Sequence, residues 1–186
     1  GLSTGVVTTT RITHATPAAT YAHSPERNWE SDADMPAAAI AQGCKDIAQQ
    51  LLDYSLGNGL DVVLGGGLNK FLPVGANPQF PNSKGARKDG RNLITEWQQK
   101  RPAAAFVSSG SQLAAVNAKN TRQLFGLFNG DHMNFDYDRV TRKVHEPSLA
   151  DMTRKAIEVL SKNNKGYFLM VEGGRIDHAH HAGNAF

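Results

Sequence analysis

The sequence predicts an α/β fold, a three-layer sandwich in which helices flank a largely parallel β-sheet. Three observations support this. Short apolar segments of strand length alternate with amphipathic helical segments along the chain. Residues 167–171 are apolar throughout, as expected for a strand that is covered on both faces. Eighteen glycines and eight prolines are spread along the 186 residues, which suits many junctions between strands and helices.

The N-terminal half contains two expected strands and two expected helices. A β-branched run lies near the start of the chain, and such residues favour strands. Thr16-Pro17 then supplies a capping residue followed by a proline, which suits a first helical position. After Pro36, apolar residues recur at three- and four-residue steps, as on one face of a helix. The expected elements are a strand over residues 6–12, a short helix over 18–22, a helix over 36–51 and a buried strand over 60–64.

The C-terminal half contains the strongest helix pattern of the chain. An apolar stripe follows Glu146-Pro147-Ser148, and lysines followed by Gly166 mark the end of that helix. Proline, asparagine and glycine make residues 72–90 an expected long surface loop, and the polar stretch 129–145 is expected to be an irregular insert. The other expected elements are helices over 92–100 and 112–116 and strands over 103–107, 124–128 and 167–171.

Composition excludes several classes of protein. The longest apolar run has the length of a strand, far below the roughly 20 residues of a membrane-spanning helix. The net charge is +3, but the lysines and arginines are dispersed, so we expect no nucleic-acid partner. Cys44 is the single cysteine, which rules out a disulfide within this chain.

The length of 186 residues corresponds to one domain or to a large part of one. The chain begins with Gly1 instead of methionine, enters a strand at once, and stops at Phe186, shortly after its densest polar cluster. We therefore expect residues 1–186 to be the central portion of a longer domain that is truncated at both ends.

Polar side chains are densest directly after the last expected strand. Glu172 leaves the strand, and the two glycines that follow allow a tight turn. Asp177 and His181 are four residues apart, so a helix places them on one face, where both can reach a zinc ion. His178 and His180 point to other faces and are expected to be supporting or surface residues. The alternative is a capped helix start with solvated histidines, which is hard to reconcile with three histidines and two carboxylates within ten residues.

The exit of the first strand offers weaker candidates. The Thr16 hydroxyl could cap a helix or bind a hard cation such as magnesium. His14 alone would be a hydrogen-bonded structural histidine. Arg27 could hold an oxyanion with two parallel hydrogen bonds or form a surface ion pair. The glycines at 65–67 resemble a phosphate cradle, but they lack the spacing of one, and we interpret them as a turn that needs positive φ.

Specific motifs follow one another in order along nearly the whole chain. Together they closely resemble those of alkaline phosphatases, and the first and last are the most specific. They are Thr8-Thr9-Thr10-Arg11, His14-Ala15-Thr16-Pro17-Ala18, Tyr21-Ala22-His23, Arg27-Asn28-Trp29, Ser31-Asp32-Ala33-Asp34, Cys44-Lys45-Asp46-Ile47-Ala48, Asp61-Val62-Val63-Leu64-Gly65-Gly66-Gly67, Asp89-Gly90-Arg91-Asn92-Leu93, Pro147-Ser148-Leu149, Val171-Glu172-Gly173-Gly174-Arg175-Ile176-Asp177-His178 and His180-His181.

This resemblance implies hydrolysis of phosphate monoesters through a phosphoserine intermediate, at a site with two zinc ions and one magnesium ion. Thr16 and Glu172 match magnesium ligands of the family, and Asp177 and His181 match two ligands of the first zinc. In the family, two zinc ions clamp the attacking and leaving oxygens of an in-line displacement.

The resemblance also assigns two catalytic residues near the first strand. Arg27 matches the arginine that clamps the substrate phosphate, where charge must be stabilised during transfer. His14 matches a residue beside the magnesium water and the phosphate. The natural phosphomonoester stays open, because binding in the family is concentrated on the phosphate.

The chain departs from the family in what it does not contain. The nucleophilic serine and an acidic residue that bridges zinc and magnesium lie upstream in the family, and an Asp-His pair and a further histidine lie downstream. The chain therefore holds about half of the metal shell, and we expect it to be inactive in isolation. The alternatives are a catalytically inactive metal-binding module and a related metal-dependent phosphodiesterase, sulfatase or phosphomutase.

The resemblance carries further implications. Family members are commonly homodimers outside the cytoplasm, as periplasmic, secreted or surface-anchored proteins, and membrane anchoring of this protein stays open. Cys44 matches a family cysteine with an upstream disulfide partner, and the alternative is a buried free thiol. Animal members carry a calcium site, which Phe128 and Glu146 match. Gln79 and Asn129 stand where carboxylates would be, so that site is left open.

Overall fold

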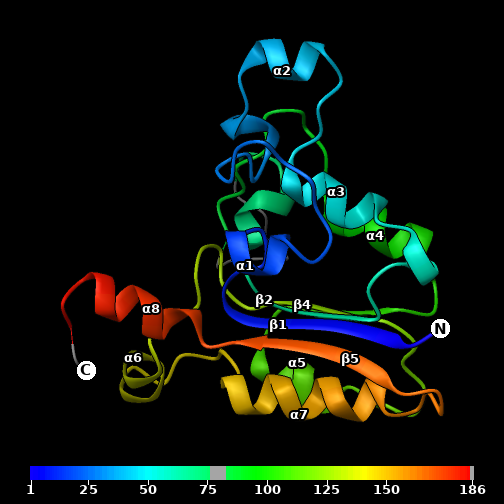
Figure 1. Cartoon of the computed structure of the whole chain (residues 1–186). Helices are drawn as coiled ribbons and strands as arrows, with labels where there is room; N and C mark the ends of the chain where they lie inside the picture. The colour runs from blue at the N-terminus through cyan, green and yellow to red at the C-terminus, as the bar shows by residue number, and fades with distance from the viewer. Residues whose placement is uncertain (76–82, 185–186) are drawn as a thin grey trace.

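A computed structural model of the chain describes residues 1–75 and 83–184. Its centre is a five-stranded sheet in the order β3-β4-β2-β1-β5, and every neighbouring pair is parallel (Figure 1). The strands are β1 (Ser3–Arg11), β2 (Val62–Gly66), β3 (Ala105–Val107), β4 (Leu124–Leu127) and β5 (Tyr167–Glu172).

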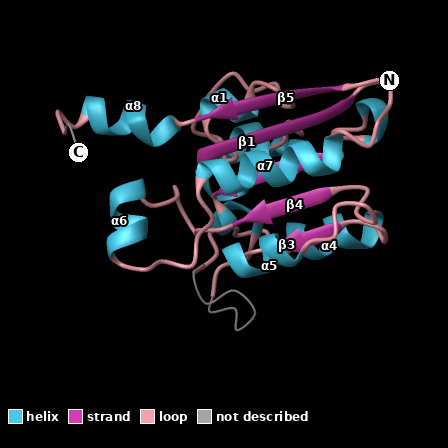
Figure 2. Cartoon of the chain, turned by 90° about the horizontal axis from the view of Figure 1, so that it is seen from below, coloured by secondary structure: helices cyan, strands magenta, loops and turns pink. Residues whose placement is uncertain are grey.

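Helices cover both faces of this sheet, which confirms the predicted class (Figures 1 and 2). On one face lie α1 (Ala15–Ala18), α3 (Ile47–Asp53) and α4 (Leu93–Lys100), and on the other lie α5 (Gly110–Ala115) and α7 (Leu149–Leu160). The remaining helices are α2 (Ala37–Ala41), α6 (Asp136–Thr141) and α8 (Gly174–His181), with short 3-10 turns η1 (Asp32–Asp34), η2 (Leu56–Asn58) and η3 (Leu68–Phe71).

Two apolar cores hold the layers together, one on each face of the sheet. In the first, the buried ring of Phe125 on β4 meets Phe71, Trp97 and Phe106 edge-on, at centroid distances of 5.3–5.6 Å. In the second, α7 lays its apolar stripe on β1, β2 and β5. Ser148 and Asp151 form a reciprocal capping box at the start of α7, where the sequence predicts that this helix begins.

Four expectations about elements are wrong. The helix over 36–51 is two helices: Gly43 has a φ of 82°, which ends the first, and Asp46 caps α3 by accepting the Gln49 N–H. The first short helix begins at Ala15, earlier than predicted. The insert contains α6. Strand β5 was expected to be covered on both faces. It is instead an edge strand whose Phe168 is 61% exposed, because an edge position lacks neighbours on one side.

Cys44 lies exposed between α2 and α3. The interpretation as a buried thiol is therefore wrong, and a disulfide with an upstream cysteine stays a prediction. Gly67, with a φ of 96°, supplies the expected positive-φ turn after β2. No helix within residues 1–75 and 83–184 has the length and apolar character needed to span a membrane.

Candidate functional site

The candidate residues gather at the carboxyl end of the sheet, where parallel α/β sheets bind ligands. Strand β1 ends here and leads to α1, β5 leads directly to α8, and β4 leads to the insert that contains α6. Figures 1 and 2 show α8 and α6 beyond this end of the strands. Segments far apart in the sequence thus share one edge.

Glu172 ends β5 and lies half-buried beside β1. Its Oε2 accepts hydrogen bonds from the hydroxyls of Thr8, at 2.6 Å, and Thr10, at 3.3 Å. Its Oε1 accepts no hydrogen bond from the described residues. A carboxylate that is oriented through one oxygen and open at the other suits a hard cation such as magnesium.

Thr16 lies inside α1 and not at its cap. The capping residue is His14, and its side chain makes no capping hydrogen bond. The Thr16 hydroxyl is exposed and has no hydrogen-bond partner among residues 1–75 and 83–184. The interpretation as a helix cap is therefore wrong, and the hydroxyl is free to bind a ligand.

Asp177 and His181 lie on one exposed face of α8, as the i,i+4 spacing predicts. The distance from Asp177 Oδ1 to His181 Nε2 is 3.4 Å, and both side chains are largely exposed. Two ligands of a tetrahedral zinc ion, each about 2.0–2.1 Å from the metal, are separated by roughly 3.4 Å. The pair therefore fits a zinc ion without rearrangement.

Arg27 contacts His14, and the distance from Arg27 Nη2 to His14 Nε2 is 3.2 Å. Arg27 is exposed and makes no ion pair within the described part of the chain. The interpretation as a surface ion pair is therefore not supported. A guanidinium without a carboxylate partner retains its donors for an anion.

Three histidines form a cluster that the sequence analysis did not predict. His14, His132 and His178 come from α1, the insert and α8, and ring centroids lie 4.4–5.4 Å apart. One nitrogen of each lies within 4.8 Å of the others, close enough to share a metal ion. His178 is thus part of the site rather than a surface residue. His132 was missed because the strand-exit rule was not applied to β4, which leads directly to it.

Arginines surround this cluster. Arg11 pairs with Glu30 at 2.7 Å and with Asp131 at 2.6 Å, and its Nη1 lies 2.7 Å from His132 Nε2. Burial, followed by the nearby arginines, lowers the pKa of His14 and His178, and burial and Arg11 lower the pKa of His132 to about 3. The three imidazoles are therefore neutral at pH 7.

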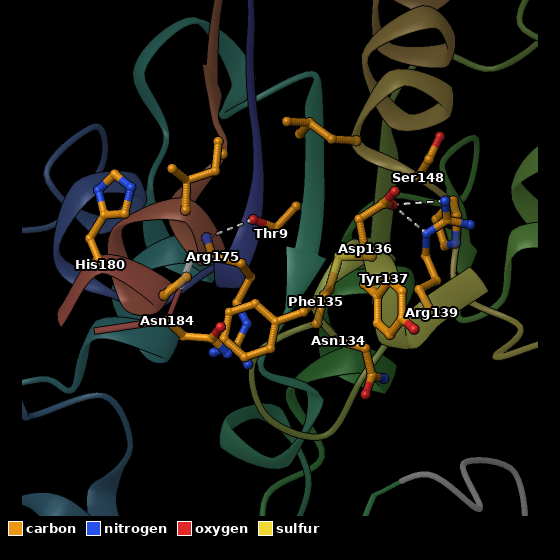
Figure 3. Close-up of a pocket in the computed structure, with 16 residues that line it drawn as sticks. Thr9, Asn134, Phe135, Asp136, Tyr137, Arg139, Ser148, Arg175, His180 and Asn184 are labelled. Atoms are coloured by element: carbon orange, nitrogen blue, oxygen red, sulfur yellow. Dashed lines mark hydrogen bonds and ion pairs between the residues drawn. The ribbon is translucent and has the colours of Figure 1, made fainter. Parts of the chain in front are cut away.

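An apolar cavity of about 340 Å³ is lined by residues of the insert, the start of α7 and α8 (Figure 3). Phe135, Leu149 and Ile176 contribute apolar walls. The guanidinium carbon of Arg175 lies 3.8 Å from the centroid of the Phe135 ring, and the Arg175 backbone N–H donates to the Thr9 hydroxyl at 3.2 Å. Arg175 thus lines the cavity and also contacts the cluster, because its Nη1 lies 2.8 Å from His178 Nδ1.

The residues of the possible calcium site do not fit a cation. Glu146 is buried, and its carboxylate accepts hydrogen bonds from Asn129 Nδ2 at 2.5 Å, Asn134 N at 2.9 Å and Asn134 Nδ2 at 2.8 Å. Amide donors therefore occupy the carboxylate, where a calcium ion would need its oxygens. Gln79 lies outside the described residues.

We expect added calcium, or its removal with EGTA, to leave the melting temperature of the wild-type protein unchanged. Asn129→Asp replaces a donor with a carboxylate beside Glu146, so we expect it to destabilise the fold by about 1–3 kcal/mol. Calcium should then restore part of this loss, because the variant places two carboxylates together. Calorimetry of both proteins with calcium or EGTA measures this, and a calcium-dependent wild type would contradict it.

A family model and the most similar curated proteins point to the same family. The family model described as alkaline phosphatase matches residues 1–186. The chain is 44% identical over 192 residues to the tissue-nonspecific isozyme of alkaline phosphatase from Gallus gallus and 42% identical to that of Homo sapiens. Each match covers 100% of this chain and 36% of the relative.

Solved structures agree with the sequence relatives. The crystal structure of alkaline phosphatase from Thermus thermophilus matches 100% of this chain and 32% of its own chain, with a TM-score of 0.75 and 34% identity. The chain thus spans about a third of the length of the proteins that it matches.

Proposed function

Because the chain belongs to the alkaline phosphatase family, we propose that the full-length protein hydrolyses phosphate monoesters through a phosphoserine intermediate. One observation carries this proposal. His14, which contacts Arg27, lies 5.4 Å from His178 between ring centroids, and His178 belongs to the helix that bears Asp177 and His181. The candidate anion-binding arginine and the helix that bears the candidate zinc ligands are therefore linked through two histidines, although 150 residues separate Arg27 from Asp177.

The proposed site holds two zinc ions and one magnesium ion in the full-length protein. Asp177 and His181 would bind one zinc ion, and Thr16 and Glu172 would bind magnesium, in agreement with the free oxygens and the 3.4 Å ligand separation. Bound metals of this kind polarise phosphoryl oxygens and lower the pKa of a nucleophile. The serine itself and the other ligands are expected elsewhere in the full-length protein.

The residues of this chain act on the phosphoryl group through hydrogen bonds and charge. Arg27 can donate two parallel hydrogen bonds to phosphoryl oxygens, whose charge needs stabilisation during transfer. His14 Nε2 holds one end of that guanidinium and so orients it. Glu172 is in turn oriented by the Thr8 and Thr10 hydroxyls of β1, a rigid strand at the centre of the sheet. This arrangement supports a preorganised site.

The similarity to alkaline phosphatases extends the proposal to the substrates, the oligomeric state and the cellular location of the protein. We propose small phosphomonoesters as substrates, no nucleic-acid partner, a homodimer, and a location outside the cytoplasm. The exposure of Cys44, which leaves it accessible for a disulfide, is compatible with such a compartment.

The test is turnover of p-nitrophenyl phosphate by the full-length protein. We expect hydrolysis that a chelator abolishes and that zinc together with magnesium restores, whereas the isolated 186-residue chain should give none. Bis(p-nitrophenyl) phosphate and p-nitrophenyl sulfate serve as controls for the related enzyme classes. Faster turnover of either control would replace the proposal with a phosphodiesterase or a sulfatase, and an inactive full-length protein would support a metal-binding module.

A further inference from the structure

Thr8 and Glu172 form a cross-strand pair at the carboxyl end of the sheet. They lie opposite each other in the register of β1 and β5, and the Thr8 hydroxyl donates to Glu172 Oε2 at 2.6 Å. Thr8 is fully buried, and its hydroxyl accepts from the Thr10 backbone N–H at 3.0 Å. An ionised carboxylate can only accept hydrogen bonds, so the single hydroxyl proton of Thr8 is directed at Glu172.

Two glycines make room for this pair, one on β2 and one at the start of α8. An added Cβ at Gly65 would lie 2.9 Å from Thr8 Cγ2, so even alanine would force the Thr8 side chain and its hydroxyl to shift. An added Cβ at Gly174 would overlap Thr10 Cγ2 and lie 3.1 Å from the Glu172 carboxyl carbon. Close packing on both sides therefore holds the hydroxyl against the carboxylate.

This pairing leaves Glu172 with one oxygen for a metal ion. Oε2 accepts the Thr8 hydroxyl at 2.6 Å, and the Thr10 hydroxyl lies 3.3 Å from the same atom. Each oxygen of a carboxylate offers about two lone pairs, so two donors are enough to occupy Oε2. Oε1, in contrast, accepts no hydrogen bond from residues 1–75 and 83–184. A cation therefore binds Glu172 through Oε1 alone unless the hydroxyls move away.

Magnesium and calcium ions differ in what they need from such a carboxylate. Mg²⁺ takes a near-octahedral shell at about 2.0–2.1 Å and is commonly held by one or two carboxylates together with waters. Ca²⁺ takes about six to eight oxygens at about 2.3–2.6 Å and binds some carboxylates through both oxygens. A glutamate restricted to one oxygen meets the need of Mg²⁺ but withholds an oxygen from the larger shell. The restriction therefore weakens the binding of Ca²⁺ more than that of Mg²⁺.

We propose that Thr8 is a specificity-determining residue of the metal site, which restricts Glu172 to binding through one oxygen and so favours Mg²⁺ over Ca²⁺. The identification of Glu172 as a magnesium ligand rests on the proposed function. Thr8 acts through Glu172 and is not a ligand itself.

The test is the metal selectivity of the full-length protein at constant free zinc. Equilibrium dialysis with free Mg²⁺ at each protein's own dissociation constant, followed by plasma mass spectrometry, gives the Ca²⁺ concentration that displaces half of the bound Mg²⁺. The ratio of that concentration to the Mg²⁺ dissociation constant measures selectivity. Thr8→Val keeps the shape of the side chain and removes the hydroxyl, so we expect this ratio to fall about 10-fold. Thr8→Ser keeps the hydroxyl and should give the wild-type ratio.

Two further variants support this comparison. Thr10→Val removes the more distant donor to Glu172 and should lower the ratio by a smaller factor, so the test does not depend on one variant alone. Thr153→Val is the matched control, because the Thr153 hydroxyl donates to the Leu149 carbonyl within α7, and it should keep the wild-type ratio.

The ratio separates selectivity from a merely structural role. If the hydroxyl only stabilised the fold, Thr8→Val would weaken the binding of both ions equally, and the unchanged ratio would overturn the proposal. A changed ratio in Thr153→Val would overturn it as well. A full-length protein with the expected ratios but no turnover of p-nitrophenyl phosphate would overturn the proposed function alone. Turnover by a wild type that binds no Mg²⁺ would overturn the role of Thr8 alone.

Discussion

Arg87→Met should lower the free energy of unfolding by about 3–5 kcal/mol, the largest stability effect that we expect from one side chain. The Arg87 side chain is fully buried. Its Nη2 lies 2.9 Å from Asp46 Oδ2, 2.5 Å from Asp89 Oδ2 and 3.6 Å from Asp32 Oδ1. Methionine fills similar space but leaves the buried Asp46 carboxylate without a counter-charge. Asp46 also caps α3, so the loss extends to the start of that helix.

The same cluster gives stability a dependence on acid. Burial, the largest single effect, would raise the pKa of Asp89, but the hydrogen bonds from Arg87 and the Arg91 backbone, together with the charges of both arginines, outweigh it and lower the pKa. A carboxyl whose pKa is lowered by folding stabilises the protein above its unfolded pKa, near 4, and this contribution is lost as the pH falls through the folded value. Arg87→Met should therefore remove part of the acid sensitivity of the wild type.

Urea denaturation followed by tryptophan fluorescence measures both effects. Arg142→Met is the matched control, because Arg142 is 70% exposed and its pair with Asp138 lies on the surface of α6. We expect that control to stay within about 0.5 kcal/mol of the wild type. If Arg87→Met unfolded at the same urea concentration as the wild type, the buried cluster would contribute nothing to stability.

The spacing of apolar residues and the residues at helix ends predicted those helices and strands whose form depends on their own sequence. Helix α7 was predictable because its apolar period and its start at Ser148 agree. Its end was predicted less well, because the helix stops at Leu160, before the lysines and Gly166 that were expected to mark it. The break between α2 and α3 was not, because the apolar period continues through Gly43, and only the backbone shows that this glycine adopts positive φ. The apolar run of β5 likewise indicates a strand but does not say whether a neighbour covers it.

The candidate site divides in the same way. The Asp177–His181 pair follows from helix geometry alone, since four residues separate its members. The histidine cluster depends on contacts between residues more than 100 positions apart, such as Arg11 with His132, and no local spacing encodes these. The buried ion cluster of Arg87 has the same origin, because Asp46 lies 41 residues away. The polar residues that follow the strands predicted the correct end of the sheet for the site, but they did not predict which side chains meet there.

Arg27→Ala in the full-length protein should lower kcat/KM for p-nitrophenyl phosphate by roughly 10²–10³-fold, as expected when a donor to a developing oxyanion is removed. Arg27 makes no ion pair in the described ranges, and its contact with His14 holds only one end of the guanidinium. The other donors are free for phosphoryl oxygens. Arg27→Lys keeps the charge but loses the two-pronged geometry, so it should recover only part of the rate.

Zinc content distinguishes the loss of the phosphate clamp from the loss of metal. Arg27→Ala should retain the zinc of the wild type, because a guanidinium is not a metal ligand, whereas Asp177→Ala removes one of the two proposed ligand atoms that lie 3.4 Å apart and should lose zinc. Inorganic phosphate should raise the melting temperature of the wild type more than that of Arg27→Ala, by mass action on the folded state. If Arg27→Ala lost zinc as well, or if phosphate protected it as it does the wild type, Arg27 would not be the phosphate clamp. The activity loss would then come from a disturbed metal site, since the His14 contact is the route by which Arg27 reaches the cluster.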